Sequence, residues 1–541
     1  MKNIFFILFI SSITVYSQAP TIEWQKVYGG AIGETPNSIC QTSDGGFILA
    51  GISFSMAGAG DITQNSVNNK SDIWIIKITS LGVKQWQRKI RADSMFDSRP
   101  KIKQTPDGGY IIGIDSDSGV GYDKTVPSKG ASDYWILKLD SIGTIIWQKS
   151  IGGAGPESLS NLELTTDGGY IISGDSSSTA SGDKTENRIN NSNDYWIVKL
   201  DSIGNVVWDN TIGGNFNDNN PVVKPTIDGG YIVSGYSDSN SSVDKTQNSY
   251  GNYDYWVVKL DANGVVQWDK TIGGDYVDYS IWLVQSSDGN YYISGFSFSG
   301  VSGLKTEPNH QGDIWIVKLD SSGNILWENT IGGNYSEEFP YIYTTNDGGI
   351  IMLCNSVSDI SGDKTQNNRG ISVTTFTDQE TPDYWMVKLD SNGIVQWDKT
   401  IGGNLRDSIF GNNVLQTSDG GFIVGGSSSS LISGDKTITN YGSPNFWILK
   451  LSPENLETNQ TTLENSVVYP NPTNDIVNIN FKEKLNDYTV KLSTIFGQQV
   501  LVKRFSQVAN VTLEILGESG IYFLSIENEN QEKKTFKIVK K

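Results

Sequence analysis

Histidine is almost absent from this chain, with His310 as its single example among 541 residues. Zinc sites, histidine-assisted nucleophiles and proton shuttles normally use at least one histidine and often several. This scarcity argues against most hydrolase and metalloenzyme chemistries, and no cofactor is predicted. His310 lies alone in a polar stretch, so we expect it to be a solvated loop residue.

Basic residues and cysteines are also few. The 41 Lys and Arg residues are outnumbered by 60 Asp and Glu, which leaves a net charge of −19. Such a chain gains little from releasing counterions on phosphates, so nucleic acid is not an expected partner. The two cysteines, Cys40 and Cys354, fall in different sequence repeats. We interpret both as small buried hydrophobic residues rather than as a disulfide.

Long apolar runs are missing beyond the N-terminus. Residues 1–17 begin with Lys2, continue through an apolar stretch and end in Val15-Tyr16-Ser17, a pattern that predicts a signal peptide. The apolar part is too short to span a bilayer, and no later run reaches the ~18 apolar residues that a transmembrane helix needs. No transmembrane segment is therefore expected.

What the chain has in abundance is glycine and aromatic residues, with 58 Gly, 15 Trp and 24 Tyr, which favours an all-β protein. Three markers recur with a period of about sixty residues. An aromatic strand with Trp at its third position starts at Asp72, Asp133, Asp194, Asp254, Asp313, Asp383 and Asn445. An Asp-Gly-Gly turn starts at Asp44, Asp107, Asp167, Asp228, Asp347 and Asp419, with an Asp-Gly-Asn variant at Asp288. A Trp strand ending in Gly-Gly starts at Trp24, Trp147, Trp208, Trp268, Trp327 and Trp397, with Trp86 lacking the glycines.

Each repeat is predicted to form four strands. The Asp-Gly-Gly turn suits a tight hairpin, and a second hairpin follows around the turn 261–264. Trp256 and Val258 face one side of their strand while Tyr255 and Val257 face the other, so both faces of the sheet must be covered. Seven such sheets packed face to face predict a seven-bladed β-propeller of four-stranded blades.

The ends of the repeat region complement one another. The last repeat stops at Leu451 without a fourth strand, while residues 22–27 form an unpaired fourth strand before the first repeat. We therefore expect a propeller over residues 18–451 that is closed by the N-terminal strand 22–27. The repeats resemble the Asp-Gly-Gly-Tyr-Ile propeller repeats of exported bacterial proteins. This resemblance covers about residues 22–451, and it implies the fold but says almost nothing about the function.

A second domain follows a polar linker over residues 452–466. Residues 467–541 contain six alternating strand candidates, enough for a small β-sandwich. Three short motifs and a basic end closely resemble the C-terminal sorting domain of the type IX secretion system. Their characteristic residues are Tyr469, Pro470, Asn471, Pro472, Gly497, Gly520 and Tyr522. The resemblance implies engagement with that secretion machinery and a final location outside the outer membrane, either secreted or attached to the surface. An ordinary adhesive sandwich is the alternative.

Two sets of polar residues are candidates for binding. A carboxylate recurs four residues after each Gly-Gly, on a loop leading toward the central channel, where a ring of acids could bind a cation or a polyhydroxylated ligand. The set comprises Glu34, Glu157, Asp218, Asp278, Glu337 and Asp407, while the second repeat has Phe96 followed by Asp97. A structural role at the junction of neighbouring blades is the alternative, and repetition in every blade favours it.

The other set is an Asp-Lys-Thr loop that starts at Asp123, Asp183, Asp244, Asp363 and Asp435. Its oxygen atoms could suit calcium, but the spacing of a dedicated calcium loop is absent, so we favour turn formation. The repeats depart from symmetry in the insertion 371–381 and in the second repeat at 90–92. The leading hypothesis is a non-catalytic binding module for a glycan or a protein. The alternative is a carbohydrate-active enzyme that uses a carboxylate pair on the propeller face.

Overall fold

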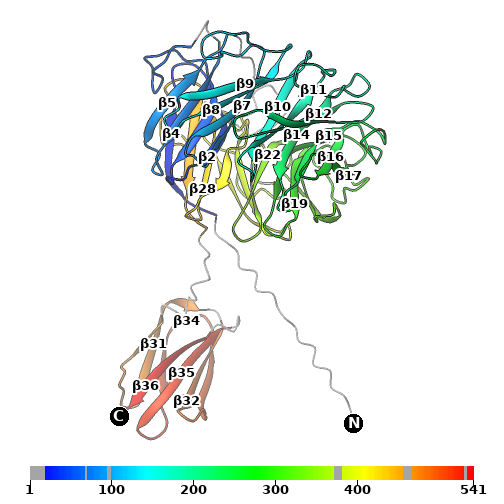
Figure 1. Cartoon of the computed structure of the whole chain (residues 1–541). Helices are drawn as coiled ribbons and strands as arrows, with labels where there is room; N and C mark the ends of the chain where they lie inside the picture. The colour runs from blue at the N-terminus through cyan, green and yellow to red at the C-terminus, as the bar shows by residue number, and fades with distance from the viewer. Residues whose placement is uncertain are drawn as a thin grey trace, which may run out of the picture. The chain divides into compact units, whose positions relative to one another are not determined.

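A computed structural model describes residues 19–66, 70–93, 99–370, 381–454, 466–485, 487–528 and 533–541. The predicted signal peptide, most of the predicted linker, Phe96, Asp97 and nearly all of the insertion 371–381 lie outside these residues. One compact unit spans Ala19–Glu454 and a second lies in the C-terminal residues. All the regular secondary structure of the described residues consists of β-strands (Figure 1), which confirms the all-β prediction.

Seven antiparallel sheets build the first unit, as predicted for a seven-bladed propeller. Six blades take four consecutive strands each, and the seventh combines strands from both ends of the unit. The innermost strands are β2 (Glu34–Gln41), β6 (Lys101–Gln104), β10 (Glu157–Leu164), β14 (Asp218–Pro225), β18 (Asp278–Gln285), β22 (Glu337–Thr344) and the interrupted pair β26 (Asp407–Ser408) and β27 (Val414–Gln416). The second strands are β3 (Phe47–Ser53), β7 (Tyr110–Ser116), β11 (Tyr170–Ser176), β15 (Tyr231–Ser237), β19 (Tyr291–Ser297), β23 (Ile350–Ser356) and β28 (Phe422–Ser428).

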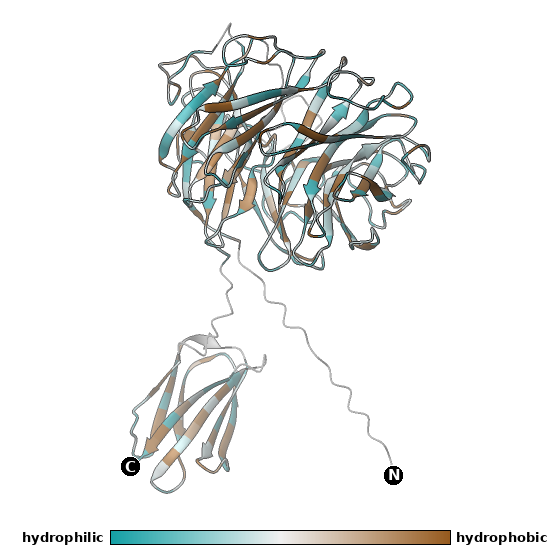
Figure 2. Ribbon diagram, viewed as in Figure 1, coloured by the Kyte–Doolittle hydropathy of each residue, from teal (hydrophilic) through white to brown (hydrophobic). Residues whose placement is uncertain are grey.

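The third strands are entirely buried and carry the aromatic marker. They are β4 (Asp72–Ile78), β8 (Asp133–Leu139), β12 (Asp194–Leu200), β16 (Asp254–Leu260), β20 (Asp313–Leu319), β24 (Asp383–Leu389) and β29 (Asn445–Leu451). The outermost strands are β5 (Lys84–Ile90), β9 (Ile145–Ile151), β13 (Val206–Ile212), β17 (Val266–Ile272), β21 (Ile325–Ile331), β25 (Val395–Ile401) and β1 (Ile22–Tyr28). In Figure 2 the most hydrophobic stretches lie on the strands, where the blades pack on one another.

The Asp-Gly-Gly turn fixes the first hairpin of each blade. In the fourth blade Gly229 has a φ of 84°, a conformation that favours glycine. The Asp228 carboxylate accepts hydrogen bonds from the Thr226 hydroxyl and from the Gly230 N–H. It also pairs with the buried Lys259 on the third strand, at 2.9 Å. The turn thus satisfies its own backbone and neutralises a buried lysine.

Aromatic contacts join neighbouring blades. Trp256 is fully buried, and its indole N–H donates to Asp269 on the outer strand at 3.0 Å. Tyr195 of the preceding blade lies against its ring, with 5.1 Å between the ring centroids. Tyr255 makes the same contact with Trp315 of the following blade. The same two strand positions therefore provide packing within and between blades.

The first and last parts of the propeller sequence share the seventh blade. Strand β1 pairs antiparallel with β29, and Val27 lies opposite Trp447. Gln25 accepts the indole N–H of Trp447 at 3.0 Å, the role that Asp269 has in the fourth blade. Strands β2 and β28 lie side by side in Figure 1 and contact one another. The N-terminal strand thus supplies the outer strand of the last blade.

The C-terminal unit is a small β-sandwich, as predicted. One sheet has the order β30-β31-β34 and the other β33-β32-β35-β36. A separate hydrophobic core fills the space between them, and it includes Val490, Leu524 and Ile526. The strands are β30 (Val467–Tyr469), β31 (Ile476–Leu485), β32 (Tyr488–Thr494), β33 (Gln499–Phe505), β34 (Val508–Glu514), β35 (Gly520–Asn528) and β36 (Lys533–Lys540).

Candidate functional site: a cavity in the central channel

The innermost strands of neighbouring blades contact one another around the propeller axis. A cavity of about 540 Å³ lies where these strands begin. It is lined by residues from β6, β10, β14, β18 and β22 and by the sixth residue of several second strands. Its size suits a small molecule or one or two sugar units.

The sixth position of the second strand is where the repeats differ most visibly. In the first five blades this residue is half-buried, while the other six residues of the strand are buried. From the first blade to the seventh it is Ile52, Asp115, Asp175, Tyr236, Phe296, Asn355 and Ser427. The repeated strand thus carries six residue types at this position in seven blades, and Asp115, Asp175, Tyr236 and Phe296 of this set line the cavity.

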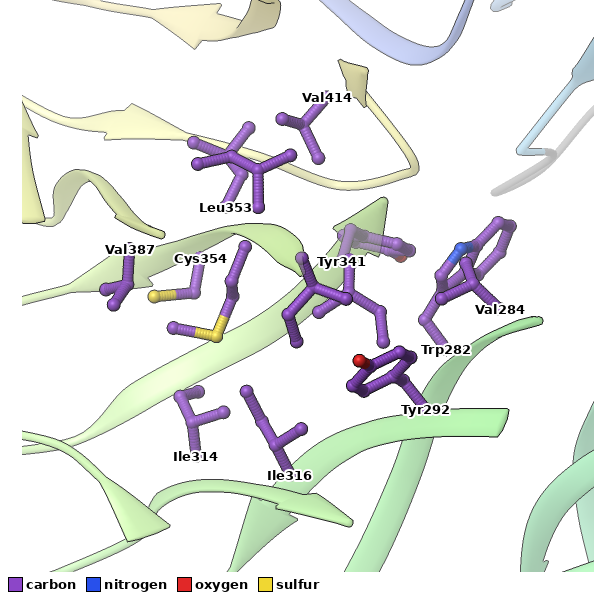
Figure 3. Close-up of a cluster of buried hydrophobic side chains, with 14 of the residues drawn as sticks. Trp282, Val284, Tyr292, Ile314, Ile316, Tyr341, Leu353, Cys354, Val387 and Val414 are labelled. Atoms are coloured by element: carbon purple, nitrogen blue, oxygen red, sulfur yellow. The ribbon is translucent and has the colours of Figure 1, made fainter. Parts of the chain in front are cut away.

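One wall of the cavity is aromatic. Tyr236 and Tyr279 lie 4.8 Å apart between ring centroids, and Tyr279 and Phe296 lie 5.2 Å apart. Trp282 on β18 and Tyr341 on β22 pack edge to face at 5.4 Å and extend toward one another in Figure 3. The indole N–H of Trp282 is buried and has no hydrogen-bond partner within the described chain. The wall therefore combines flat apolar faces with an unused donor.

The lining also carries charge, from Asp115, Asp175, Lys101 and Arg99. Burial raises the pKa of Asp115 to about 6. Burial, with a smaller contribution from the nearby Asp115 carboxylate, raises the pKa of Asp175 to about 7. Burial lowers the pKa of Lys101 to about 8. These groups titrate close to neutral pH, a property that clusters at functional sites.

Two further cavities share residues with this one. A cavity of about 470 Å³ also contacts Trp282 and lies where the innermost strands end. Between the two, the ammonium group of Lys224 lies 4.4 Å from the Trp282 ring centroid, and Lys224 and Lys103 both pair with Glu163. A shallower cavity of about 420 Å³ shares Tyr279 with the main cavity and continues past Tyr253.

The six carboxylates predicted from sequence as ligand-binding residues occupy another place. Each is the first residue of an innermost strand, is almost fully buried, and lines none of the three cavities. Each accepts the N–H of the second glycine of the preceding Gly-Gly, at 2.7 to 3.1 Å. Each also accepts a serine hydroxyl. These bonds suit a junction between blades, and ligand binding by the set stays a prediction.

A second acid adjoins most of these carboxylates. In the fifth-blade junction Asp254 lies beside Asp278, and its Oδ2 accepts the Tyr250 N–H at 2.6 Å. Its Oδ1 is buried without a partner within the described chain. In the junction that closes the ring, Asn445 takes the place of this aspartate and donates from Nδ2 to the Glu34 carboxylate at 2.8 Å.

The Asp-Lys-Thr loops bond to the preceding blade and to the outer strand of their own blade. Asp244 accepts the Gly213 N–H at 3.1 Å, and the Thr246 hydroxyl donates to Asp269 at 2.6 Å. The intervening Lys245 is buried, and its Nζ lies 5.7 Å from the Trp256 ring centroid. Among the described residues no group of three or more His, Cys, Asp or Glu side chains could hold a metal ion.

Sequence reasoning missed the residues that line the cavity. Lys101, Tyr279 and Trp282 belong to no motif, and the acid shared by Asp115 and Asp175 recurs in only two of the seven repeats. The sequence feature that could have revealed them is variation between repeats. Aligning the seven repeats position by position shows that the sixth residue of the second strand varies although the residue after it is always serine.

The sorting-motif residues hold the edge of the C-terminal sandwich together. Asn471 donates to the Lys537 carbonyl and accepts the Val539 N–H, so it ties the Tyr-Pro-Asn-Pro segment to β36. Gly497 has a φ of 79° in the turn between β32 and β33. Tyr522 is buried on β35 and donates to the Glu518 carbonyl at 2.8 Å.

Comparison with known proteins identifies the C-terminal unit. Residues 467–541 match the family described as the secretion system C-terminal sorting domain. No curated protein matches the chain. Within the described residues, no helix is long and apolar enough to cross a membrane.

Solved structures resemble the chain only distantly. A protein of unknown function from Dyadobacter fermentans DSM 18053 shares 10% identity over 80% of this chain and 99% of its own, with a TM-score of 0.42. BBS1N in complex with ARL6DN shares 10% identity over 81% of this chain and 99% of its own, with a TM-score of 0.40. An ACO/RPE65 chimera shares 13% identity over 73% of this chain and 96% of its own, with a TM-score of 0.35. Similarity at this level carries no argument about function. The chain thus joins a seven-bladed β-propeller to a C-terminal sorting domain of the type IX secretion system, which implies export.

Proposed function

We propose that the propeller is a binding module that holds a glycan in the cavity of its central channel, without chemical conversion. One observation carries this proposal. At the sixth position of the second strand, the repeats place Asp115, Asp175, Tyr236 and Phe296 in the cavity lining, while the next residue of that strand is serine in all seven repeats. A purely structural ring gains nothing from such variation.

The chemistry of the walls suits a sugar. Tyr236, Tyr279 and Phe296 offer aromatic faces on which the apolar face of a sugar ring can stack. Asp115 and Asp175, in the same lining, can donate hydrogen bonds to hydroxyl groups or accept them because they titrate near neutral pH. A few placed polar groups among aromatic faces are typical of small-molecule sites.

The ligand is proposed to be a chain rather than a single sugar. Tyr279 belongs both to the main cavity and to the shallower one. Tyr253 and Tyr279 lie 5.6 Å apart between centroids, and the half-exposed Phe216 follows on the same surface. A row of aromatic side chains leading out of the cavity can contact successive sugar units.

Export places such a module where glycans are found. The predicted signal peptide 1–17 would take the chain to the periplasm, and the sorting domain would then engage the type IX machinery. In this proposal the propeller ends either released or attached to the outer surface.

A carbohydrate-active enzyme is the second candidate, because the cavity contains its own carboxyl pair. Asp115 and Asp175 lie on neighbouring blades, and their pKa values of about 6 and 7 allow one to be protonated while the other is ionised. Glycoside cleavage uses one carboxylic acid and one carboxylate.

A glycan array probed with the full chain, followed by titration calorimetry and a product screen on every hit, tests both candidates. Saturable binding without products is expected. Tyr279→Ala should weaken binding about tenfold or more, since stacking on the shared aromatic residue is lost. Tyr441→Ala is the matched control, because Tyr441 is 54% exposed and lines none of the three cavities. Turnover abolished by Asp175→Asn would replace the binding proposal with the enzymatic one.

A further inference from the structure

Lys101 differs from every other buried lysine of the propeller. The others direct Nζ to an acid, a hydroxyl group or a carbonyl oxygen, as Lys259 does to Asp228 and Lys245 does to Ser237. Lys101 is only 8% exposed, yet its Nζ forms no hydrogen bond or ion pair with any described residue. A buried cation without a partner is costly to a fold.

Among the described residues, the charged groups around Lys101 are mostly cations. Arg99, Lys103 and Lys224 repel it, while Asp115 is the acid that attracts it. Glu163 is already shared between Lys103 and Lys224. Together with Asp175, which also lines the cavity, the described charged groups here are the four cations Lys101, Arg99, Lys103 and Lys224 and the three acids Asp115, Asp175 and Glu163, a small positive excess in a chain whose net charge is −19.

A second donor without a partner lines the same cavity. Trp282 is 3% exposed, and its indole N–H is unused within the described chain. Arg99, an exposed residue, adds a further cation to the lining. Two buried donors and one exposed guanidinium group in a single cavity are suited to an anionic group of the ligand.

We propose that the cavity binds a glycan through a carboxylate-bearing sugar unit, with Lys101 and Trp282 donating to the carboxylate. The aromatic wall of Tyr236, Tyr279 and Phe296 covers the ring of that unit. This inference rests on the proposed glycan-binding function and specifies its ligand as an acidic polysaccharide. Neutral glycans lack the group that Lys101 would pair with.

The test compares oligouronates with their methyl esters, which keep the sugar and remove the charge. Oligomers of galacturonate, mannuronate and glucuronate are titrated calorimetrically into the full chain. The acid form of at least one series is expected to bind at least about tenfold more tightly than its ester, because a charge-assisted hydrogen bond contributes a free energy of this size. Lys101→Met should remove this preference while ester binding stays at the wild-type level, and Lys101→Arg should retain part of it.

Lys149→Met is the matched control. Lys149 lies on β9 in the same blade, outside the cavity, and bonds to Asn205 at 3.1 Å. It should leave the preference unchanged. Equal binding of acid and ester, or a preference that survives in Lys101→Met, would overturn the acidic-ligand inference and leave glycan binding standing. Failure of every glycan, acidic or neutral, to bind would overturn both. Because ester binding reports on the folded cavity, a misfolded Lys101→Met protein is recognised, and Lys101→Arg then decides.

Discussion

Replacing Asp254 with asparagine should stabilise the propeller at neutral pH. Asp254 and Asp278 are two buried acids at one blade junction, and each has an oxygen without a hydrogen-bond partner among the described residues. Burial raises the pKa of Asp254 to about 6 from an ordinary value of 3.8. Asn445 shows which of the two acids holds the proton, because it occupies the equivalent position and donates to Glu34. The Oδ1 of Asn445 accepts the Tyr441 N–H at 2.8 Å, just as Asp254 accepts the Tyr250 N–H.

The size and sign of the effect follow from linkage. Below about pH 4 both the folded and the unfolded chain protonate Asp254. Between pH 4 and 6 only the folded chain keeps the proton, so stability falls by ~1.4 kcal/mol per pH unit. The total loss by pH 7 is ~3 kcal/mol, and asparagine cannot titrate. Asp254→Asn should therefore be ~1–3 kcal/mol more stable than wild type at pH 7.5 and about equal at pH 4.

Urea unfolding followed by tryptophan fluorescence at pH 4.5 and pH 7.5 measures this difference, and the infrared band of protonated carboxylic acids should lose intensity in the variant. Asp278→Asn is the matched control. Asp278 accepts hydrogen bonds from the Gly274 N–H and the Ser299 hydroxyl. An asparagine at this position would place its own NH₂ donor against these donors, so Asp278→Asn should destabilise the protein at both pH values. If Asp254→Asn destabilised the protein as much at pH 7.5 as at pH 4.5, Asp254 would be an ionised acceptor and the reasoning would fail.

Three further predictions concern the junctions, the closure and the tail. Asp218→Ala and Glu337→Ala should each lower the free energy of unfolding by ~1–3 kcal/mol, because hydrogen-bond donors are left unsatisfied. The melting temperature should not respond to calcium or to a chelator. A calcium-dependent shift in melting temperature that either substitution abolishes would instead indicate a cation site. Deleting residues 21–30 should expose the edge of β29 and cause self-association in size-exclusion chromatography, and an unchanged monomer with unchanged melting would exclude closure by this strand. Deleting residues 467–541 should leave a folded propeller in the periplasm, which fractionation and surface proteolysis would check; surface exposure of this protein would disprove sorting by the tail.

Repetition explains why the fold could be predicted from the sequence. Each Asp-Gly-Gly turn, such as that at Asp228, makes a hairpin through local bonds that the sequence itself specifies. The alternation of Tyr255 and Trp256 requires packing on both faces of the sheet. Seven copies of such local signals leave few other arrangements.

The candidate site could not be predicted in the same way, because its residues meet only through the closed ring. Lys101 and Trp282 lie 181 positions apart in sequence and come from the second and fifth blades. Neither position has a local signature, since a lysine or tryptophan on a strand normally indicates packing. The junction carboxylate Asp278 was found by its regular spacing, and that regularity accompanies local hydrogen bonds.

The pairing of β1 with β29 has a consequence for the order of events in the cell. Gln25 and Trp447 are 422 positions apart, so the strand that the ribosome makes first finds its partner among the last residues of the propeller. Translation of the whole propeller therefore ends before the ring can close. Until then the blades form an open arc with two unsatisfied edges, and this state exposes the chain to misassembly. Joining the two ends turns the arc into a body with no free edge at which unravelling could start.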